Sequence, residues 1–179
     1  MNKGILYAAG AYAAWGLLPI YWRFLHDVPA LEILAHRIVW ALLVAAVLLA
    51  ARGNWSELRA AARSPRIMLT FFASALLLFA NWYIYILAVN AGHIVETSLG
   101  YFINPLINVL LGVLFLRERL RLWQGVAVAI ALAGVLYLTF EFGALPWIAL
   151  GLASTFGAYG LLRKTAALGS LEGFTLETL

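Results

Sequence analysis

The sequence predicts an all-α integral membrane protein, a polytopic bundle of transmembrane helices. Of its 179 residues, 65% are hydrophobic and 11% are charged, whereas a soluble domain is about 45–50% apolar and about 25% charged. Apolar runs of roughly 20 residues, the length that a helix needs to cross the hydrocarbon core of a bilayer, recur along the chain. This composition excludes a soluble globular domain and a disordered chain. The absence of cysteine excludes a disulfide framework and a thiolate nucleophile.

Six charge-poor runs are the expected spans. They are Gly4–Trp22, Ile33–Ala51, Ile67–Ala91, Ile94–Leu116, Leu122–Phe140 and Phe142–Leu162. The first run is too long for the hydrophobic part of a signal peptide and lacks a small-residue cleavage site after it, so we interpret it as a retained span. The intervening residues 53–65 are rich in arginine and are expected to form a short interfacial helix.

The basic residues predict the orientation of these spans. With the N-terminus in the cytoplasm, ten of the 12 Lys and Arg residues fall on the inner side. They are Lys3, Arg52, Arg59, Arg63, Arg66, Arg117, Arg119, Arg121, Arg163 and Lys164. Cytoplasmic loops of membrane proteins are enriched in Lys and Arg. The net charge of +4 therefore indicates topology, and we expect the lipid bilayer, and no nucleic acid, as the partner.

An internal repeat relates the first and sixth spans at an offset of 141 residues. Gly10 then aligns with Gly151, and Gly16 aligns with Gly157. The repeat unit holds five spans, residues 4–140, and an odd number of spans inverts the second copy, which occupies residues 142–179. Since Glu172–Leu179 has the composition of a seventh span that has just begun, we expect the 179 residues to be part of a ten-span protein.

Polar stripes on the third and fourth spans are the candidate site. At about 100° per residue, one face of the fourth span is polar and the opposite face is apolar. The polar face consists of His93, Thr97, Tyr101, Asn104 and Asn108, and the third span has a similar stripe of Thr70, Ser74, Asn81 and Tyr85. Because polar groups avoid lipid, two inward stripes predict a shared cavity. The alternative is hydrogen bonding between helices, which we favour for Thr70 and Ser74.

Three ionisable residues lie near the outer ends of their spans: Arg37, His93 and Glu96. Glu96 forms an outer salt bridge, or it takes up and releases a proton with the help of Arg37 or His93, and both interpretations remain open. Pro105 removes a backbone donor and loosens the helix near the Tyr101 carbonyl. These three residues and Pro105 are candidates for proton coupling or gating. Glu118 is expected only to balance the arginines around it.

The chain lacks the usual motifs of an intramembrane enzyme. It contains no His-Glu-x-x-His and no Gly-x-Ser-x-Gly, and no pair of intramembrane aspartates. We therefore expect no catalytic residues, no metal and no cofactor. A membrane assembly subunit that transports nothing is the remaining alternative to a transporter.

The fourth span carries the motif AVNAGHIVETSLGYFINPLINVLLG (residues 88–112), which resembles the signature of RarD-type proteins. These are a branch of the EamA-domain transporters in the drug/metabolite transporter superfamily. Further similarities are Ala14-Trp15-Gly16, His36-Arg37, Leu116-Arg-Glu-Arg-Leu120, Gly125 with Gly134, and the segment Leu171–Leu179. The resemblance covers the whole chain.

This resemblance implies ten spans, arranged as two inverted five-helix repeats, of which this chain holds six spans. It also implies a multi-pass protein of the bacterial inner membrane that transports a small organic solute, a drug or metabolite, by alternating access. We expect an aromatic group to contact the solute, namely Trp15, Trp82, Tyr85 and Tyr101. We expect Asn81, Asn104 and Asn108 to orient the solute, while its identity, the coupling ion, the direction of transport and the oligomeric state stay open.

Overall fold

A computed structural model describes residues 3–25, 27–53, 55–143 and 145–179, without the side chains of Lys3, Pro19, Trp22, Arg23 and Phe142. The described residues form eight α-helices and no strand, which confirms the all-α prediction. The helices are α1 (Lys3–Arg23), α2 (Ala30–Arg52), α3 (Trp55–Ala62), α4 (Pro65–Asn90), α5 (Ile94–Leu116), α6 (Leu122–Phe142), α7 (Trp147–Thr165) and α8 (Ser170–Thr178).

Four of these helices are long and apolar enough to cross a membrane: α2, α4, α5 and α6. They coincide with four of the six predicted spans. The first predicted span forms α1, whose described apolar stretch, Gly4–Leu18, is shorter. The sixth predicted span forms α7, a helix of 19 residues that is not among the four. The chain is a polytopic helical membrane protein.

The start of the sixth span was predicted wrongly. Phe142 is the last residue of α6, and Gly143 ends that helix in the left-handed region, with φ of 65°. Glycine adopts this conformation without the steric cost that a Cβ adds. Pro146 then caps α7, whose first residue is Trp147. The apolar run crosses this turn because Phe142, Leu145 and Trp147 are all hydrophobic, so hydropathy alone placed the boundary too early.

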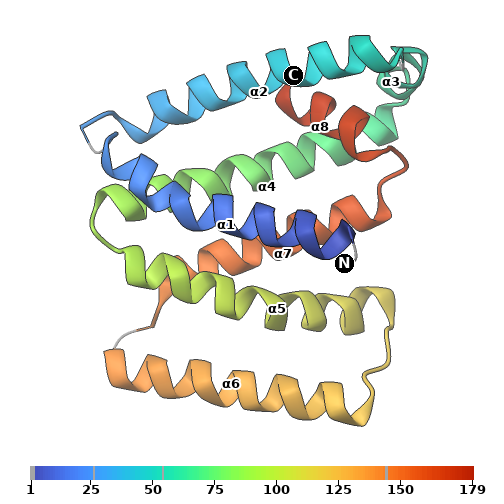
Figure 1. Ribbon diagram of the computed structural model, residues 1–179. Helices are drawn as coiled ribbons and strands as arrows, with labels where there is room; N and C mark the ends of the chain where they lie inside the picture. The colour runs from blue at the N-terminus through green and yellow to red at the C-terminus, as the bar shows by residue number, and fades with distance from the viewer. Residues whose placement is uncertain (1–2, 26, 54, 144) are drawn as a thin grey trace.

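The helices lie as a stack in which α7 and α8 insert between the helices of the first five spans (Figure 1). Helix α7 packs against both α4 and α5, whereas α8 packs against α2 and α4. Helix α6 lies at one edge of the stack beside α5. In Figure 1, α1 and α7 run in opposite directions, as do α2 and α8.

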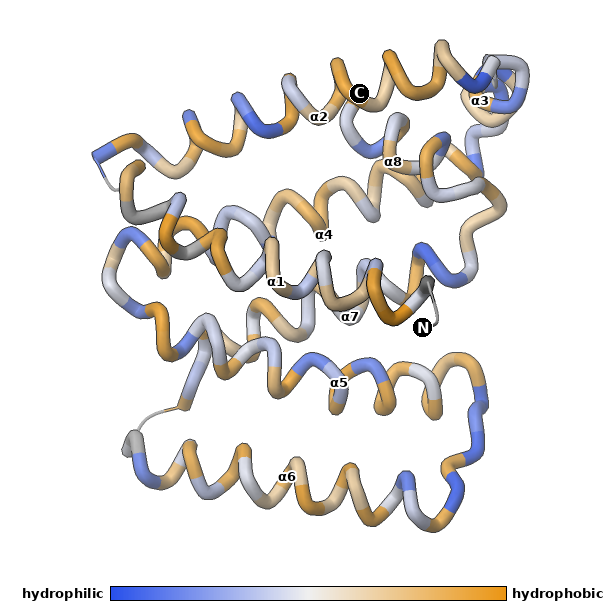
Figure 2. The backbone as a smooth tube through the Cα atoms, viewed as in Figure 1, coloured by the Kyte–Doolittle hydropathy of each residue, from blue (hydrophilic) through white to orange (hydrophobic). Residues whose placement is uncertain are grey.

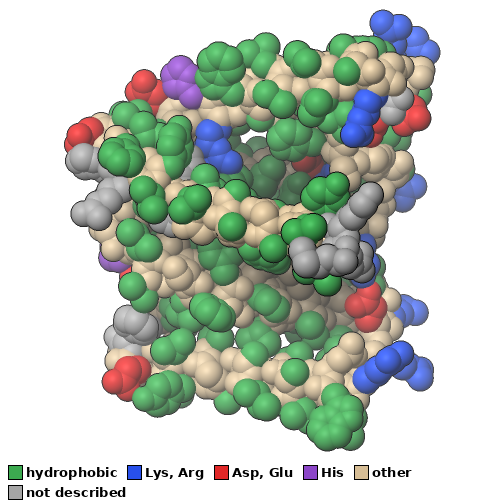
Figure 3. Space-filling model, in the orientation of Figure 1, with side chains coloured by type: hydrophobic (Ala, Val, Ile, Leu, Met, Phe, Trp, Pro, Cys, Tyr) green, Lys and Arg blue, Asp and Glu red, His purple; other side chains and the backbone are tan. Residues whose placement is uncertain are grey.

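Hydrophobic residues make up most of the length of the long helices (Figure 2), and many of their large side chains are exposed. None of the described residues of α6 is buried, and its large side chains are widely exposed, among them Ile130 (68%) and Phe140 (82%). Water would penalise such a surface, whereas lipid tails solvate it. Lys and Arg side chains gather at the end of the bundle where α2 joins α3 and α5 joins α6 (Figures 1 and 3). The predicted interfacial helix is α3, whose Leu58 is buried.

Candidate functional site

The predicted polar faces meet at a small pocket between four helices. Trp15 of α1, Asn81 of α4, and Tyr101 and Asn104 of α5 all line it. Helix α7 closes the fourth side with Leu152 and Phe156, and the lining also includes Trp82, Thr97 and Gly100. Its volume is about 20 Å³, which is room for about one water molecule. In this conformation the site is therefore closed around its own side chains.

Four aromatic side chains form a continuous series of ring contacts beside this pocket. The ring centroids are 6.1 Å apart for Trp15 and Tyr101, 6.4 Å for Tyr101 and Tyr85, and 5.6 Å for Tyr85 and Trp82. Two of these pairs are edge-to-face, a preferred arrangement of aromatic rings. At the end of the series, the guanidinium carbon of Arg37 lies 3.4 Å from the centre of the Trp82 ring. The sequence predicted that these four aromatic residues act as a group that contacts the solute. It did not predict that Arg37 contacts one of them, Trp82.

Asn81 joins α4 to α7. Its Nδ2 atom donates hydrogen bonds of 2.9 Å to the Leu152 carbonyl oxygen and to Thr155 Oγ1. These bonds explain why a polar residue is placed inside the span, because an amide without partners in lipid would cost several kcal/mol. The amide nitrogen of Asn81 is thus used within the protein in this conformation.

The asparagines of α5 contact each other. Asn108 Nδ2 donates to Asn104 Oδ1 at 3.2 Å, one turn apart along the helix. Pro105 lies between them, and α5 runs through it from Ile94 to Leu116 without interruption. Asn104 borders the pocket, whereas the hydrogen bond between the two amides is exposed.

His93 and Glu96 form a pair at the start of α5. His93 Nδ1 lies 2.8 Å from Glu96 Oε1, and the two side chains are 50% and 30% exposed. Of the two residues predicted to assist Glu96, His93 is therefore in contact with it. Arg37, the other, lies against Trp82 in the interior.

A second and larger cavity, of about 650 Å³, lies between α2, α4 and α8. Figure 3 shows the molecule hollowed below α2, with a basic side chain at the edge of the hollow. Its lining includes Tyr21, His36, Arg37, Trp40, Phe79 and Trp82. Trp82 lines both cavities. Sequence reasoning missed this cavity, although the consecutive His36 and Arg37 inside an apolar span were a signal for it.

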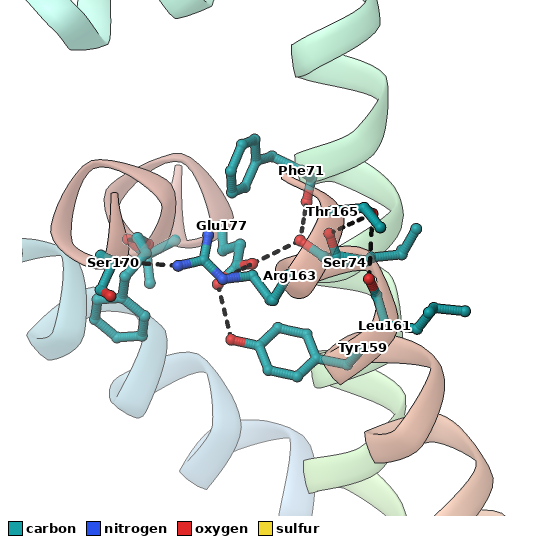
Figure 4. Close-up of polar contacts among 11 residues, drawn as sticks. Phe71, Ser74, Tyr159, Leu161, Arg163, Thr165, Ser170 and Glu177 are labelled. Carbon is teal, nitrogen blue, oxygen red and sulfur yellow. Dashed lines mark hydrogen bonds and ion pairs between the residues drawn. The ribbon is translucent and has the colours of Figure 1, made fainter. Parts of the chain in front are cut away.

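A buried polar network around Glu177 was also missed (Figure 4). Ser74 Oγ donates a hydrogen bond of 2.6 Å to Glu177 Oε1, and the Tyr159 hydroxyl donates one of 3.3 Å to Oε2. Arg163 Nε lies 3.7 Å from Oε1, and its guanidinium carbon lies 5.2 Å from the centre of the Phe71 ring. Ser74 thus makes the interhelical hydrogen bond that was favoured for it. Thr70 instead donates to the Arg66 carbonyl within α4.

Arg163 and Glu118, which were predicted to lie on the inner side, have more specific contacts than the sequence suggested. The side chain of Arg163 is only 18% exposed, because it turns back toward α8. Glu118 was expected only to balance neighbouring arginines, but Lys164 Nζ donates to its Oε1 at 2.6 Å. This ion pair ties the α5–α6 connection to the end of α7. Within the part of the chain that the structure describes, no group of His, Asp and Glu could hold a metal ion.

An all-helical bundle with long apolar helices and large exposed apolar side chains defines a polytopic membrane protein. The chain belongs to the EamA-like transporter family, whose model matches residues 2–140. This confirms the family that the fourth-span motif indicated.

The relatives carry transporter or RarD names. The chain is 48% identical over 181 residues to the uncharacterized transporter YojE of Bacillus subtilis, covering 99% of this chain and 60% of the relative. It is 45% identical over 178 residues to Protein RarD of Escherichia coli, with the same coverage of 99% and 60%. The chloramphenicol-sensitive protein RarD of Pseudomonas aeruginosa is 36% identical over 182 residues, 99% of this chain and 61% of that protein. The chain therefore spans about 60% of the length of these relatives. No solved structure matches it.

Proposed function

We propose that the protein is a secondary transporter that moves a small organic solute across the bacterial inner membrane by alternating access. The observation that carries this proposal is the meeting of Trp15, Asn81, Tyr101 and Asn104 at one pocket between α1, α4, α5 and α7. Asn104 is the eleventh of the 23 residues of α5, so the pocket lies near mid-membrane. Substrate sites of secondary transporters typically lie at this depth.

The small volume of the pocket fits the proposal if the site opens during transport. Alternating access requires that a bundle of helices moves against another around the site. Tyr101 contacts the ring of Trp15, and Asn104 accepts an exposed hydrogen bond from Asn108. Both contacts are weak and break at low free-energy cost. Asn81, Tyr85, Tyr101, Asn104 and Asn108 then exchange contacts within the protein for contacts with the solute.

The opposite directions of α1 and α7, and of α2 and α8, support an inverted repeat. Its first unit consists of α1 to α6, and its second unit begins with α7, whose first residue is Trp147. The gathering of Lys and Arg at one end of the bundle supports a cytoplasmic location for that end and for the N-terminus.

The test is solute flux into proteoliposomes that contain the purified protein. Flux of at least one small organic solute, lost in Asn81→Ala and Asn104→Ala variants that remain folded, would support the proposal. Absence of flux across a broad panel of solutes would favour the assembly subunit. The bonds of Asn81 within the protein are the observation that keeps this second candidate open.

We further propose that Glu96 couples transport to a proton, with His93 as its partner and with Arg37 and Pro105 in gating. The contact of 2.8 Å between His93 and Glu96 supports this pairing. An imposed pH gradient should then drive flux in the natural protein but not in the Glu96→Gln variant. Unchanged gradient-driven flux in that variant would mean that the pair is only an outer salt bridge.

A further inference from the structure

We propose that Trp15 is the gate of the small pocket, and that it moves away from Tyr101 to admit the solute while α4, α5 and α7 stay together as one body. This inference rests on the proposed transport function and adds to it the side on which the site opens. Residues of α1, α4, α5 and α7 line the pocket, and α1 contributes Trp15. Since the pocket volume of about 20 Å³ is far below the roughly 300–1,000 Å³ of usual ligand sites, part of the lining has to move.

Helices α5 and α7 are in close contact near their first turns. A Cβ atom at Gly100 of α5 would lie 3.1 Å from Leu152 Cβ and 3.2 Å from the Ala149 carbonyl oxygen, both of α7. Ala149 is 0% exposed, and it belongs to one buried cluster with Leu99 and Ile103 of α5. Helices inside membranes commonly associate through small residues that let their backbones approach closely. The two backbones are therefore too close here for a solute to pass between them.

The same two helices remain in contact toward their last turns. A Cβ atom at Gly157 of α7 would lie 2.6 Å from Ile107 Cγ2 and 3.3 Å from Leu111 Cδ1, both of α5. Beyond these contacts, Lys164 Nζ donates to Glu118 Oε1 at 2.6 Å and joins the end of α7 to the residues that follow α5. Any tilt of α5 away from α7 would part at least one of these contacts, so the two helices move together.

Helix α4 is joined to α7 by hydrogen bonds. Asn81 Nδ2 donates to the Leu152 carbonyl oxygen and to Thr155 Oγ1, at 2.9 Å each. About one turn along α4, Ile84 Cδ1 lies 3.4 Å from the Cβ position of Gly151 on α7. Because a donor inside the membrane that loses its partner has no water to replace it, α4 and α7 resist separation. Helices α4, α5 and α7 therefore form one body.

The contact between Trp15 and this body is of a weaker kind. Trp15 meets Tyr101 through their rings, whose centroids are 6.1 Å apart and whose planes are tilted by 57°. Parting two rings breaks no hydrogen bond, whereas parting α4 from α7 would leave the Asn81 amide without its partners. The movement that opens the pocket at the lowest free-energy cost is therefore on the α1 side.

Movement of Trp15 uncovers groups whose own arrangement does not change. Asn81, Tyr101 and Asn104 line the pocket, and all three belong to the body formed by α4, α5 and α7. A binding surface that is already arranged loses less conformational entropy on binding than one that forms from moving parts. Trp15 is thus a positioning residue that controls access to the three polar residues.

The test measures how fast a thiol inside the pocket reacts with a water-soluble reagent. The natural chain has no cysteine, so Asn104→Cys supplies the only thiol, and nanodiscs let the reagent reach both faces of the membrane. We expect Trp15→Ala to raise the labelling rate about three- to tenfold, the factor by which loss of an aromatic pair shifts an equilibrium. Trp15→Leu is the second variant, for use if Trp15→Ala does not fold, and it should raise the rate as well.

Phe156→Ala is the matched control, because Phe156 lines the same pocket and its loss also removes a ring, but on the α7 side. Since α7 stays fixed to α4 and α5, this variant should raise the labelling rate less than about twofold. An equal effect of Phe156→Ala, or an unchanged rate in the folded Trp15 variants, would overturn the inference.

A disulfide between α5 and α7 tests whether these helices stay together. Ile107→Cys with Gly157→Cys places two thiols at a close contact of the interface. Because Ile107 Cγ2 is one bond from Cβ, the two Cβ atoms are about 4 Å apart or less, within reach of a disulfide. For a solute that the natural protein transports, we expect equal flux through the oxidised and the reduced variant. Flux through the reduced variant alone would show that α5 and α7 have to separate, and would overturn the inference.

Failure of this inference can be told apart from failure of the transport function, because the labelling test needs no solute. If no solute crosses the membrane but labelling at position 104 depends on Trp15, the transport function is wrong and the gate stands. If a solute crosses the membrane while Trp15→Ala leaves the labelling rate unchanged or the disulfide stops the flux, only the gate is wrong.

Discussion

Ser74 Oγ on α4 lies 2.6 Å from Glu177 Oε1 on α8, and this hydrogen bond joins residues that are 103 positions apart in the sequence. The Glu177 side chain is 0% exposed, and Arg163 of α7 lies 3.7 Å from the same oxygen. One carboxylate therefore links three helices. A buried carboxylate is tolerated only with such partners, because an isolated charge is costly in a medium of low dielectric constant.

Replacing Glu177 with glutamine should therefore destabilise the protein. The variant leaves the largely buried guanidinium of Arg163 without its counter-charge, and breaking a buried ion pair from one side typically costs about 3–5 kcal/mol. The free energy of unfolding, measured by titration with a denaturing detergent, should fall by about 3 kcal/mol. The matched control is Glu96→Gln, whose ion pair is partly exposed and should contribute less than about 1 kcal/mol. Equal effects of the two substitutions would contradict the role of the network.

Gly173→Ala should loosen the attachment of α8. A Cβ atom at this position would overlap the Arg163 guanidinium and would lie 2.6 Å from Phe71 Cε1. Since the natural chain has no cysteine, a Thr178→Cys substitution, at a position that is 8% exposed, would supply the only thiol to label. We expect it to react faster with maleimide in the Gly173→Ala background. Gly134→Ala is the control, because nothing lies within 4 Å of its Cβ position, and it should leave the labelling rate unchanged.

Gly100→Ala should disturb the packing of α5 on α7. Its Cβ would lie 3.1 Å from Leu152 Cβ and 3.2 Å from the carbonyl oxygen of Ala149, so the backbone of α7 has to move. Overpacking of this kind costs about 1–3 kcal/mol. The midpoint temperature of thermal unfolding should be lower for Gly100→Ala than for Gly125→Ala, because no atom lies within 4 Å of the Cβ position of Gly125. A Gly100→Ala variant as stable as the Gly125→Ala variant would show that α5 and α7 are not in close contact.

Asn81→Ala should cost more stability than Asn108→Ala. Asn81 donates two hydrogen bonds of 2.9 Å to α7, whereas Asn108 donates one of 3.2 Å within its own helix. Interhelical hydrogen bonds in membranes contribute about 0.6–2 kcal/mol each. The free energy of unfolding, measured by titration with a denaturing detergent, should fall by about 1–2 kcal/mol in Asn81→Ala and by less than about 0.5 kcal/mol in Asn108→Ala. The reverse order would exclude the link between α4 and α7.

The helices, and the common face of the pocket residues on α5, could be predicted because both depend on local periodicity. His93, Asn108 and Tyr85 belong to the predicted stripes but are not among the residues that line the small pocket. Tyr101 and Asn104 are three residues apart on α5, so their common face follows from the helical repeat alone. Hydropathy also located α5 from Ile94 to Leu116. It failed at Phe142, where an apolar run crosses a turn.

The contacts that the sequence could not predict join distant segments. Two examples are the contact of Arg37 with Trp82 and the hydrogen bond of Ser74 to Glu177. Both depend on how α2, α4 and α8 pack together, and the periodicity within a single helix does not predict that packing. Arg163 was predicted to lie in an inner loop, because basic residues commonly follow the end of a span. Its long side chain instead turns back and places the guanidinium against Phe71.

Accessibility of position 104 tests the central proposal, a solute site between α1, α4, α5 and α7, most directly. The measurement is labelling of a single Asn104→Cys variant in membrane vesicles with a water-soluble thiol reagent, with and without a solute that the natural protein transports. A single Phe102→Cys variant is the control, because Phe102 is 73% exposed on the apolar face of α5. We predict that the thiol at position 104 is labelled and that the solute slows this labelling at least about threefold, whereas the thiol at position 102 stays unlabelled since it faces lipid. A thiol at position 104 that is never labelled, or that is labelled at the same rate with solute present, would contradict the account.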